Sequence, residues 1–280
     1  PVSVYDQHGA RVSGLNSWDF ALSFNEEPVP ITHFSAGTER VSMAFVLDAS
    51  GSSREIIARQ QDTALALYSR FGHESKVAVI RFSDRPEVIV PFTQNIEHAR
   101  RAFSFPALRN RKTAIFDAVK KGVDLFQSAD PTKIASALSS ERRIIILISD
   151  GLENASLLSS ANVIREAVKN GISIYVIHLP AFVPDEGHLR PRRPVKGFKE
   201  LAEETGGHFF IFGDAAMALD PRAEYDLSKI FAAIDDDLKG QYVLGFYPKE
   251  TESFSGTGKS EVRLTVPSNR KLRVKRLTGT

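Results

Sequence analysis

The sequence contains no cysteine, one tryptophan and two methionines, and its 36 basic residues nearly balance its 34 acidic ones. The absence of cysteine excludes disulfides, thiolate metal sites and cysteine nucleophiles, but it does not decide the redox compartment. A net charge of +2 creates no global field that would attract nucleic acid or an anionic membrane. No apolar run approaches the ~20 residues that cross a bilayer. With 42% hydrophobic and 25% charged residues, the composition is that of an ordinary globular protein.

From residue 41 onward, strand-like apolar runs alternate with helical patterns, which predicts a doubly wound α/β sheet. The unbroken apolar core of "RRIIILISD" indicates a central parallel strand that is covered on both faces. The short turn "DRP" and Pro91 predict one antiparallel edge strand, because an edge tolerates proline. Strands are expected at residues 41–48, 76–83, 87–93, 142–149, 172–179 and 208–212, and helices from residue 54 and at 96–103, 114–126, 159–171, 195–207 and 227–238.

Both ends of the chain depart from this alternation. Short β-like pieces occupy the N-terminal segment, and "YVLGFYP", "EVRLTV" and "KLRVKR" follow the last helix with no helix between them. The ends of a domain often lie close together, so we expect the two segments to pair in a small antiparallel β unit. The predicted organisation is therefore residues 1–37 and 242–280 as the two halves of an accessory β unit, around a main domain at 38–241. The runs "ETESFSGTGKS" and "PDEGHLRPRRP" are expected to be loops.

Oxygen-bearing side chains stand where the strands of this sheet end. Asp48 ends the first strand of the main domain and Asp150 follows "IIILIS". Ser50 and Ser52 alternate along the loop after Asp48, and Thr113 directly precedes a helix. In an open parallel sheet, ligands bind at the carboxyl ends of the strands. We therefore predict that these five side chains converge on one point.

The five predicted ligands are all hard oxygens, which favours Mg²⁺ or Mn²⁺ over Zn²⁺, with Ca²⁺ as a further oxygen-binding candidate. Three of them are neutral hydroxyls, so the ion stays short of negative charge. An Asp or Glu from a partner protein would complete its coordination, and the metal would be the centre of a binding surface. "DASGSS" alone is more often a turn, because Asp, Ser and Gly are common turn residues. Its combination with the threonine and the second aspartate favours the metal.

The Asp-x-Ser-x-Ser of "DASGS", the Thr of "KTAIFDA" and the Asp of "SDG" resemble the metal-ion-dependent adhesion site of von Willebrand factor type A domains, in the same order and at similar spacings. "LAEETGGHFFIF" also resembles the segment before that family's last strand, and the resemblance covers residues 41–241. The flanks "VYDQHGARVSGLNSWDFALSF" and "QYVLGFYP" resemble bacterial proteins related to this family, in which a small β element brackets the domain. One departure is Lys112, where the family often has Gly. A cation there disfavours metal binding slightly and favours an acidic ligand.

The resemblance implies a Rossmann-like fold and a metal-dependent protein-binding or cell-adhesion module without catalytic activity. It also implies an extracytoplasmic protein, secreted, periplasmic or at the cell surface, whose signal peptide has been removed. Similarity to integrin-like members implies that movement of the last helix tunes affinity.

Several residues near the predicted site have two interpretations. Arg109, Arg111 and Lys112 either line the rim and attract an acidic partner or belong to a solvated loop. His178, at a strand end, either lines the same rim or is a near-core histidine. Asp117 either orients the site from behind its ligands or has a helix-capping or solvated role. A second basic cluster in a Pro-rich loop is a less favoured rim: Arg190, Arg192, Arg193 and Lys196.

The sequence gives weaker support to other functions. A phosphatase of the haloacid dehalogenase type requires an aspartate where Ser50 stands, and a serine hydrolase requires a Gly-x-Ser-x-Gly elbow that the sequence lacks. RNA binding remains an alternative on the basis of the basic clusters, although no aromatics are interleaved with them. "GTGKS" is not a phosphate loop, because position 253 is serine and a strand follows.

Overall fold

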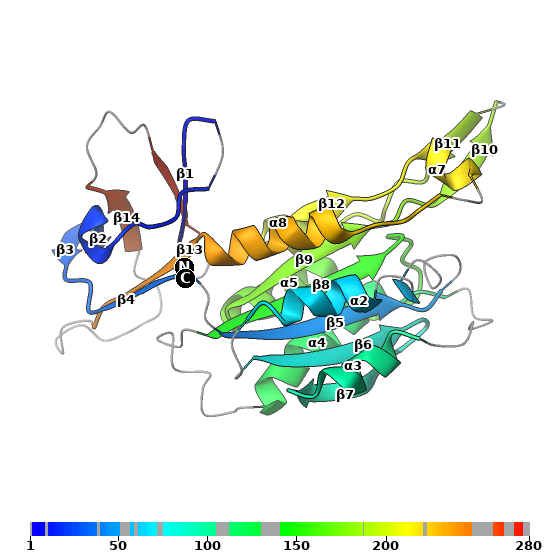
Figure 1. Ribbon diagram of the computed structural model, residues 1–280, viewed down its shortest axis with the longest axis horizontal. Coiled ribbons are helices and arrows are strands. Elements are labelled where there is room, and N and C mark those ends of the chain that lie inside the picture. The colour runs from blue at the N-terminus through cyan, green and yellow to red at the C-terminus, as the bar shows by residue number, and fades with distance from the viewer. Residues whose placement is uncertain are drawn as a thin grey trace.

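The computed structural model describes residues 2–8, 11–37, 40–50, 57–58, 61–71, 75–104, 112–129, 141–186, 188–220, 223–247, 260–265 and 272–276. Their main feature is a six-stranded sheet between two layers of helices (Figure 1). All strand pairs in it are parallel except that of β7, which lies antiparallel to β6 at one edge. The doubly wound sheet with one antiparallel edge strand is therefore confirmed. Across the sheet the strands are β12 (Phe209–Ile211), β9 (Ile172–His178), β8 (Glu141–Ser149), β5 (Arg40–Asp48), β6 (Lys76–Phe82) and β7 (Pro86–Thr93).

Helices bury both faces of this sheet. Alternate residues of β5 enter different cores, with Phe45 on the face covered by α2, α3 and α8 and Val46 on the face covered by α4, α5 and α6. Both side chains are fully buried, as expected for strands covered on both sides. The helices are α2 (Gln61–Tyr68), α3 (Ile96–Ala102), α4 (Ile115–Ala129), α5 (Ser160–Lys169), α6 (Glu200–Glu203), α7 (Ala215–Leu219) and α8 (Ser228–Lys239). None of the helices in the described part of the chain is long and apolar enough to span a membrane.

The predicted boundaries of α5 agree with its local chemistry. Ser159 caps its N-terminus by accepting a hydrogen bond from the Asn162 backbone N–H. Gly171 follows the helix with a φ of 63°, a left-handed conformation that glycine adopts without steric cost.

Two expectations along the chain were wrong. Residues 184–194, expected to be a loop, contribute to a β-hairpin formed by β10 (Phe182–Asp185) and β11 (His188–Pro191). Proline is tolerated in this two-stranded ribbon because both strands are edges. The helix expected at 195–207 is a single turn, α6, preceded by turn structure. The expected loop at 250–260 lies outside the described residues except for Ser260.

The two ends of the chain pair with each other, as predicted, and form two small antiparallel sheets. Val2, Val4, Phe20 and Tyr242 build a separate core between them, beside the main sheet (Figure 1). The domain boundaries given above stay a prediction. The first sheet has the order β15 (Arg273–Arg276), β1 (Val2–Tyr5), β13 (Gln241–Gly245) and β4 (His33–Ala36), and the second has β14 (Ser260–Leu264), β2 (Phe20–Phe24) and β3 (Glu27–Val29), with the 3-10 turn η1 (Ser17–Asp19) before β2.

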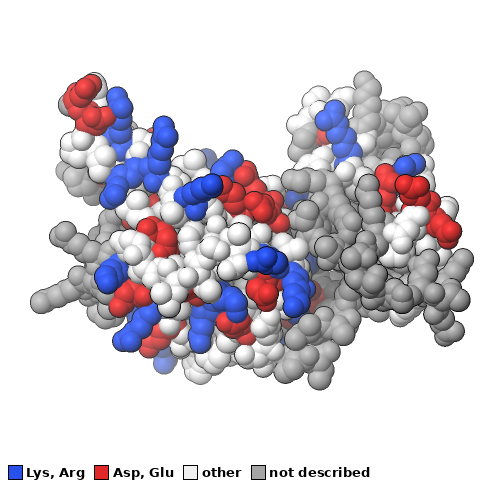
Figure 2. All heavy atoms as spheres, turned by 180° about the vertical axis from the view of Figure 1, so that it is seen from behind, with Lys and Arg blue, Asp and Glu red and all other residues white. Residues whose placement is uncertain are grey.

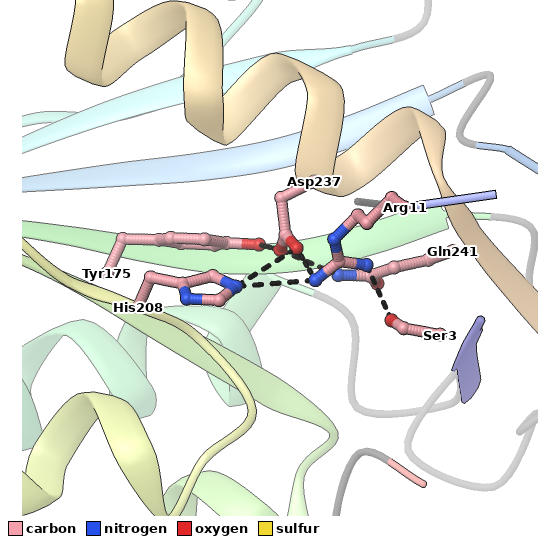
Figure 3. A network of polar contacts seen from close by, with 6 residues as sticks. All are labelled: Ser3, Arg11, Tyr175, His208, Asp237 and Gln241. Carbon is pink, nitrogen blue, oxygen red and sulfur yellow. Dashed lines mark hydrogen bonds and ion pairs between the residues drawn. The ribbon is translucent and has the colours of Figure 1, made fainter. Parts of the chain in front are cut away.

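A polar network joins the accessory sheets to the main domain (Figure 3). Its centre is Asp237 on α8, whose side chain is only 4% exposed. Asp237 forms an ion pair with Arg11 of the N-terminal segment and accepts hydrogen bonds from Tyr175 of β9 and, at 3.0 Å, from Gln241 of β13. Burial raises the pKa of Tyr175, so this hydroxyl remains a neutral donor. The six residues of the network are Ser3, Arg11, Tyr175, His208, Asp237 and Gln241.

Candidate metal centre

The two aspartates of the predicted site lie at the same edge of the main sheet. Asp48 is the last residue of β5, and Asp150 directly follows β8. These strands are adjacent and parallel, with Leu47 paired to Ile148. The chain order reverses here, because β6 lies on one side of β5 and β8 on the other. In open α/β sheets, this reversal point is where the crevice for ligands forms.

Hydroxyl groups hold the Asp48 carboxylate in one orientation. The side chain is fully buried. Its Oδ1 accepts hydrogen bonds from the Ser50 backbone N–H at 2.9 Å and from Ser50 Oγ at 2.5 Å, and its Oδ2 accepts one from Ser149 Oγ at 2.6 Å. Sequence reasoning had missed Ser149. The only signal for it was its place before Asp150 on the strand beside β5.

The electrostatic environment of Asp48 and Asp150 favours binding of a cation. Burial raises the pKa of Asp48 to about 6 although the Ser149 and Ser50 hydroxyls act in the opposite direction, and the charge of Asp150 raises it further. Burial also raises the pKa of Asp150, against the Leu152 N–H and the charge of Arg192. Within the described residues, no salt bridge neutralises Asp48. A divalent ion would offset the desolvation of the two carboxylates and the repulsion between them. The hydroxyls near them are hard oxygen donors, which suit such an ion.

Thr113 is bonded to the loop that follows β8, and its neighbour Ala114 is bonded to the end of β6. It is 4% exposed and directly precedes Ala114 and α4. Its backbone N–H donates to Asn154 Oδ1 at 2.9 Å, and its carbonyl accepts from the Asn154 N–H at 3.0 Å. The next residue, Ala114, donates its N–H to the Ser83 carbonyl just past β6 at 2.7 Å. These bonds bring Thr113 to the edge that carries the two aspartates.

A reciprocal clamp fixes the loop after β8 against the start of α4. Glu153 accepts hydrogen bonds from the backbone N–H groups of Ile115 and Phe116 and from the Ser156 hydroxyl. In return, Asp117 on α4 accepts from the N–H groups of residues 157 and 158, each at 3.0 Å. Asp117 therefore anchors the loop after β8. Glu153 was not expected from the sequence, and its negative charge stabilises the N-terminus of α4.

The remaining predicted rim residues differ in their positions. Lys112 is exposed beside Thr113. Ser52, Arg109 and Arg111 lie outside the described residues. The assignment of the five oxygens as ligands stays a prediction, and in the part of the chain that the structure describes no group of three or more His, Asp or Glu is placed to hold a metal.

His178 lies beneath the site and does not line an accessible rim. It is 4% exposed, with its ring against Phe198 and Phe209. Its Nε2 lies 3.0 Å from the Asp150 carbonyl oxygen, which can only accept, so the proton is on Nε2. Burial lowers the pKa of His178, and the neutral ring supports the backbone of Asp150. The near-core interpretation of this histidine fits its position.

Comparisons with known proteins agree with this architecture. Residues 43–153 match the von Willebrand factor type A domain. This segment is therefore assigned to a von Willebrand factor type A domain. The matched segment of this domain runs from β5 through the loop after β8, so it includes both aspartates and Thr113. No curated protein matches the chain in sequence.

Solved structures show the same fold at low sequence identity. An aerotolerance-related membrane protein from Bacteroides fragilis with multiple mutations to serines has a TM-score of 0.52 and 18% identity, covering 72% of this chain and 100% of its own. A von Willebrand factor type A protein from Catenulispora acidiphila has a TM-score of 0.51 and 18% identity, covering 79% of this chain and 50% of its own. Proximal thread matrix protein 1 from the mussel byssus, with a zinc-occupied metal-ion-dependent adhesion site, has a TM-score of 0.52 and 14% identity, covering 73% and 49%. The chain thus spans about half the length of the last two.

Proposed function

We propose that this chain is a metal-dependent protein-binding module without catalytic activity. A divalent cation, Mg²⁺ or Mn²⁺ with Ca²⁺ as a further candidate, is held by Asp48, Ser50, Ser52, Thr113 and Asp150. A carboxylate from a partner protein completes its coordination. The observation that carries the proposal is the pair of desolvated carboxylates, Asp48 and Asp150, at the point where the strand order reverses.

The donor chemistry supports the choice of ion and partner. The proposed ligands include no nitrogen or sulfur, which favours Mg²⁺ or Mn²⁺. The mussel protein has zinc in its adhesion site, so zinc is a competitor that the binding experiment includes. Three of the proposed ligands are neutral hydroxyls, and Lys112 adds positive charge next to Thr113, which favours an acidic ligand from outside. An extracytoplasmic location is part of the same proposal.

Metal titration tests this function directly. Wild-type protein freed of metal with EDTA is titrated with Mg²⁺, Mn²⁺, Ca²⁺ and Zn²⁺ by calorimetry, and its melting temperature is followed in parallel. Asp48→Asn and Thr113→Val remove one proposed ligand each. Asp124→Asn, on the exposed side of α4, is the matched control.

We expect Mg²⁺ or Mn²⁺ to bind wild type and the control, and to raise their stability by about 2.7 kcal/mol at 100 times the dissociation constant. Both ligand variants should lose this gain. Equal Mn²⁺ binding by wild type and Asp48→Asn would remove the metal from the proposal.

A further inference from the structure

The β10–β11 hairpin projects from the edge of the sheet that carries the candidate metal centre. β9 ends at His178, beside the loop of Asp150, and β10 begins four residues later. The two hairpin strands pair from Phe182 with Pro191 to Asp185 with His188. Figure 1 shows the hairpin at the upper right, beyond the end of the sheet.

The chain returning from this hairpin packs on the residue that follows Asp150. The Arg192 N–H donates to the Ala181 carbonyl at 2.7 Å, and the Val195 N–H donates to the Gly151 carbonyl at 2.9 Å. A Cβ at Gly151, whose φ is 75°, would lie 2.6 Å from Pro194 Cβ. Pro194 and Val195 are therefore held in contact with the loop of the candidate metal centre, and Arg192 and Arg193 directly precede them.

Basic side chains on this returning segment face solvent. Arg192 and Arg193 are both exposed, and neither forms an ion pair within the described part of the chain. Arg190 differs, because it forms an ion pair with Asp185 at 2.7 Å on the hairpin itself. Figure 2 shows blue side chains gathered on the projection at the upper left, with red at its tip. This view is turned by 180°, so the projection is the hairpin of Figure 1.

The positive charge reaches the candidate metal centre. Pro194, two residues after Arg192, packs on Gly151, which directly follows Asp150. The guanidinium charge of Arg192 therefore repels a cation held at Asp150. A second carboxylate next to Arg192 would remove that repulsion. A guanidinium is always charged and offers paired N–H donors that match a carboxylate.

We propose that Arg192 and Arg193 form a second recognition point for the partner, so that the module selects an acidic segment with two nearby carboxylates, one for the metal and one for the arginines. This inference rests on the proposed function, because the first carboxylate is the one that binds the ion. It also makes metal and partner binding mutually reinforcing, since the second carboxylate neutralises a charge that disfavours the metal. Such coupling is reciprocal.

The test separates metal binding from partner selection. Two measurements are made on wild type and on the Arg192→Gln/Arg193→Gln double variant: calorimetry with Mn²⁺ alone, and fluorescence anisotropy with labelled glycine peptides in saturating Mn²⁺. One peptide set carries two aspartates separated by one, two or three glycines, and in the matched set the second aspartate is asparagine. Arg263→Gln is the control, because this arginine is exposed on β14, in the accessory sheet that β14 forms with β2 and β3.

We expect opposite effects on the two ligands. The double variant should bind Mn²⁺ as tightly as wild type or severalfold more tightly, and should bind the best two-aspartate peptide about tenfold more weakly. Its affinity for the one-aspartate peptides should change less than about twofold. A purely structural role of the arginines would weaken all three, and that result would overturn the inference.

Other outcomes are also decisive. Equal affinity of wild type for one- and two-aspartate peptides refutes the inference but leaves the metal-dependent module standing. Failure of wild type to bind Mn²⁺ refutes the proposed function itself. Retention of an RNA oligomer that needs Arg192 and Arg193 but no Mn²⁺ would replace the acidic partner by nucleic acid.

Discussion

Replacing Asp48 by asparagine should stabilise the metal-free protein. The folded state holds the pKa of this carboxyl at about 6, whereas its ordinary value is 3.8. Folding therefore favours the neutral form, and the ionised form is destabilising. This cost is fully developed above the folded pKa and disappears as the pH falls below 3.8. At 1.36 kcal/mol per unit of pKa, it amounts to about 3 kcal/mol at pH 7.5 and to about half of that at pH 5.

Urea unfolding in EDTA measures this difference. Asparagine keeps an oxygen that can accept from Ser50, so Asp48→Asn should be more stable than wild type by amounts of this order, with a smaller advantage at pH 5 than at pH 7.5. Comparing the two proteins at each pH cancels the contributions of titrating groups that do not interact with Asp48. Saturating Mg²⁺ should stabilise wild type alone and close most of the gap.

The reasoning would be refuted by either of two results. One is a variant no more stable than wild type at pH 7.5 in EDTA. The other is an advantage that does not change between pH 5 and 7.5, because an effect unrelated to ionisation of the carboxyl has no reason to follow its titration. Asp124→Asn, on an exposed part of α4, should differ from wild type by less than about 0.5 kcal/mol at both pH values.

Three further substitutions probe the supports of the site and of the fold. Arg11→Met removes the arginine that pairs with the buried Asp237 and should lower the free energy of unfolding by about 3 kcal/mol, measured by urea unfolding. An unchanged urea midpoint would mean that the ion pair makes no net contribution to stability. Glu153→Ala removes the acceptor of N–H groups at the start of α4 and should lower the free energy of unfolding by about 1–2 kcal/mol. If the clamp positions Thr113, calorimetry should also show weaker Mn²⁺ binding. Gly207→Ala places a Cβ 2.0 Å from the Ile174 carbonyl oxygen and should cost at least about 2 kcal/mol, so a melting temperature equal to that of wild type would contradict the close approach.

Local patterns in the sequence were sufficient for most of the main domain. The apolar runs at residues 41–48 and 142–149 specify buried strands, because only side chains that avoid water on both faces suit the middle of a covered sheet. Asp48 and Asp150 stand at the ends of those runs, so their common edge follows from the strands being parallel. Pairing of the two chain ends also followed from their β-like composition.

Other features depended on contacts between distant segments. The hairpin at 182–191 has proline and charged residues in a pattern that resembles a loop, and its pairing is visible only in the fold. The network around Asp237 joins residues 3 and 241 through side chains whose local sequences contain no sign of it.

Hydrophobic periodicity and strand direction are local properties, so the sequence was enough to predict the strands of the main sheet, their mostly parallel arrangement and the oxygen-bearing residues that follow them. Only the fold shows that Ser149 orients Asp48, that burial raises the pKa of that carboxyl, and that Arg192 lies close enough to influence Asp150. Hydrogen bonding, desolvation and electrostatic interaction depend on which groups are neighbours in space. Those neighbours come from strands and loops that are far apart along the chain.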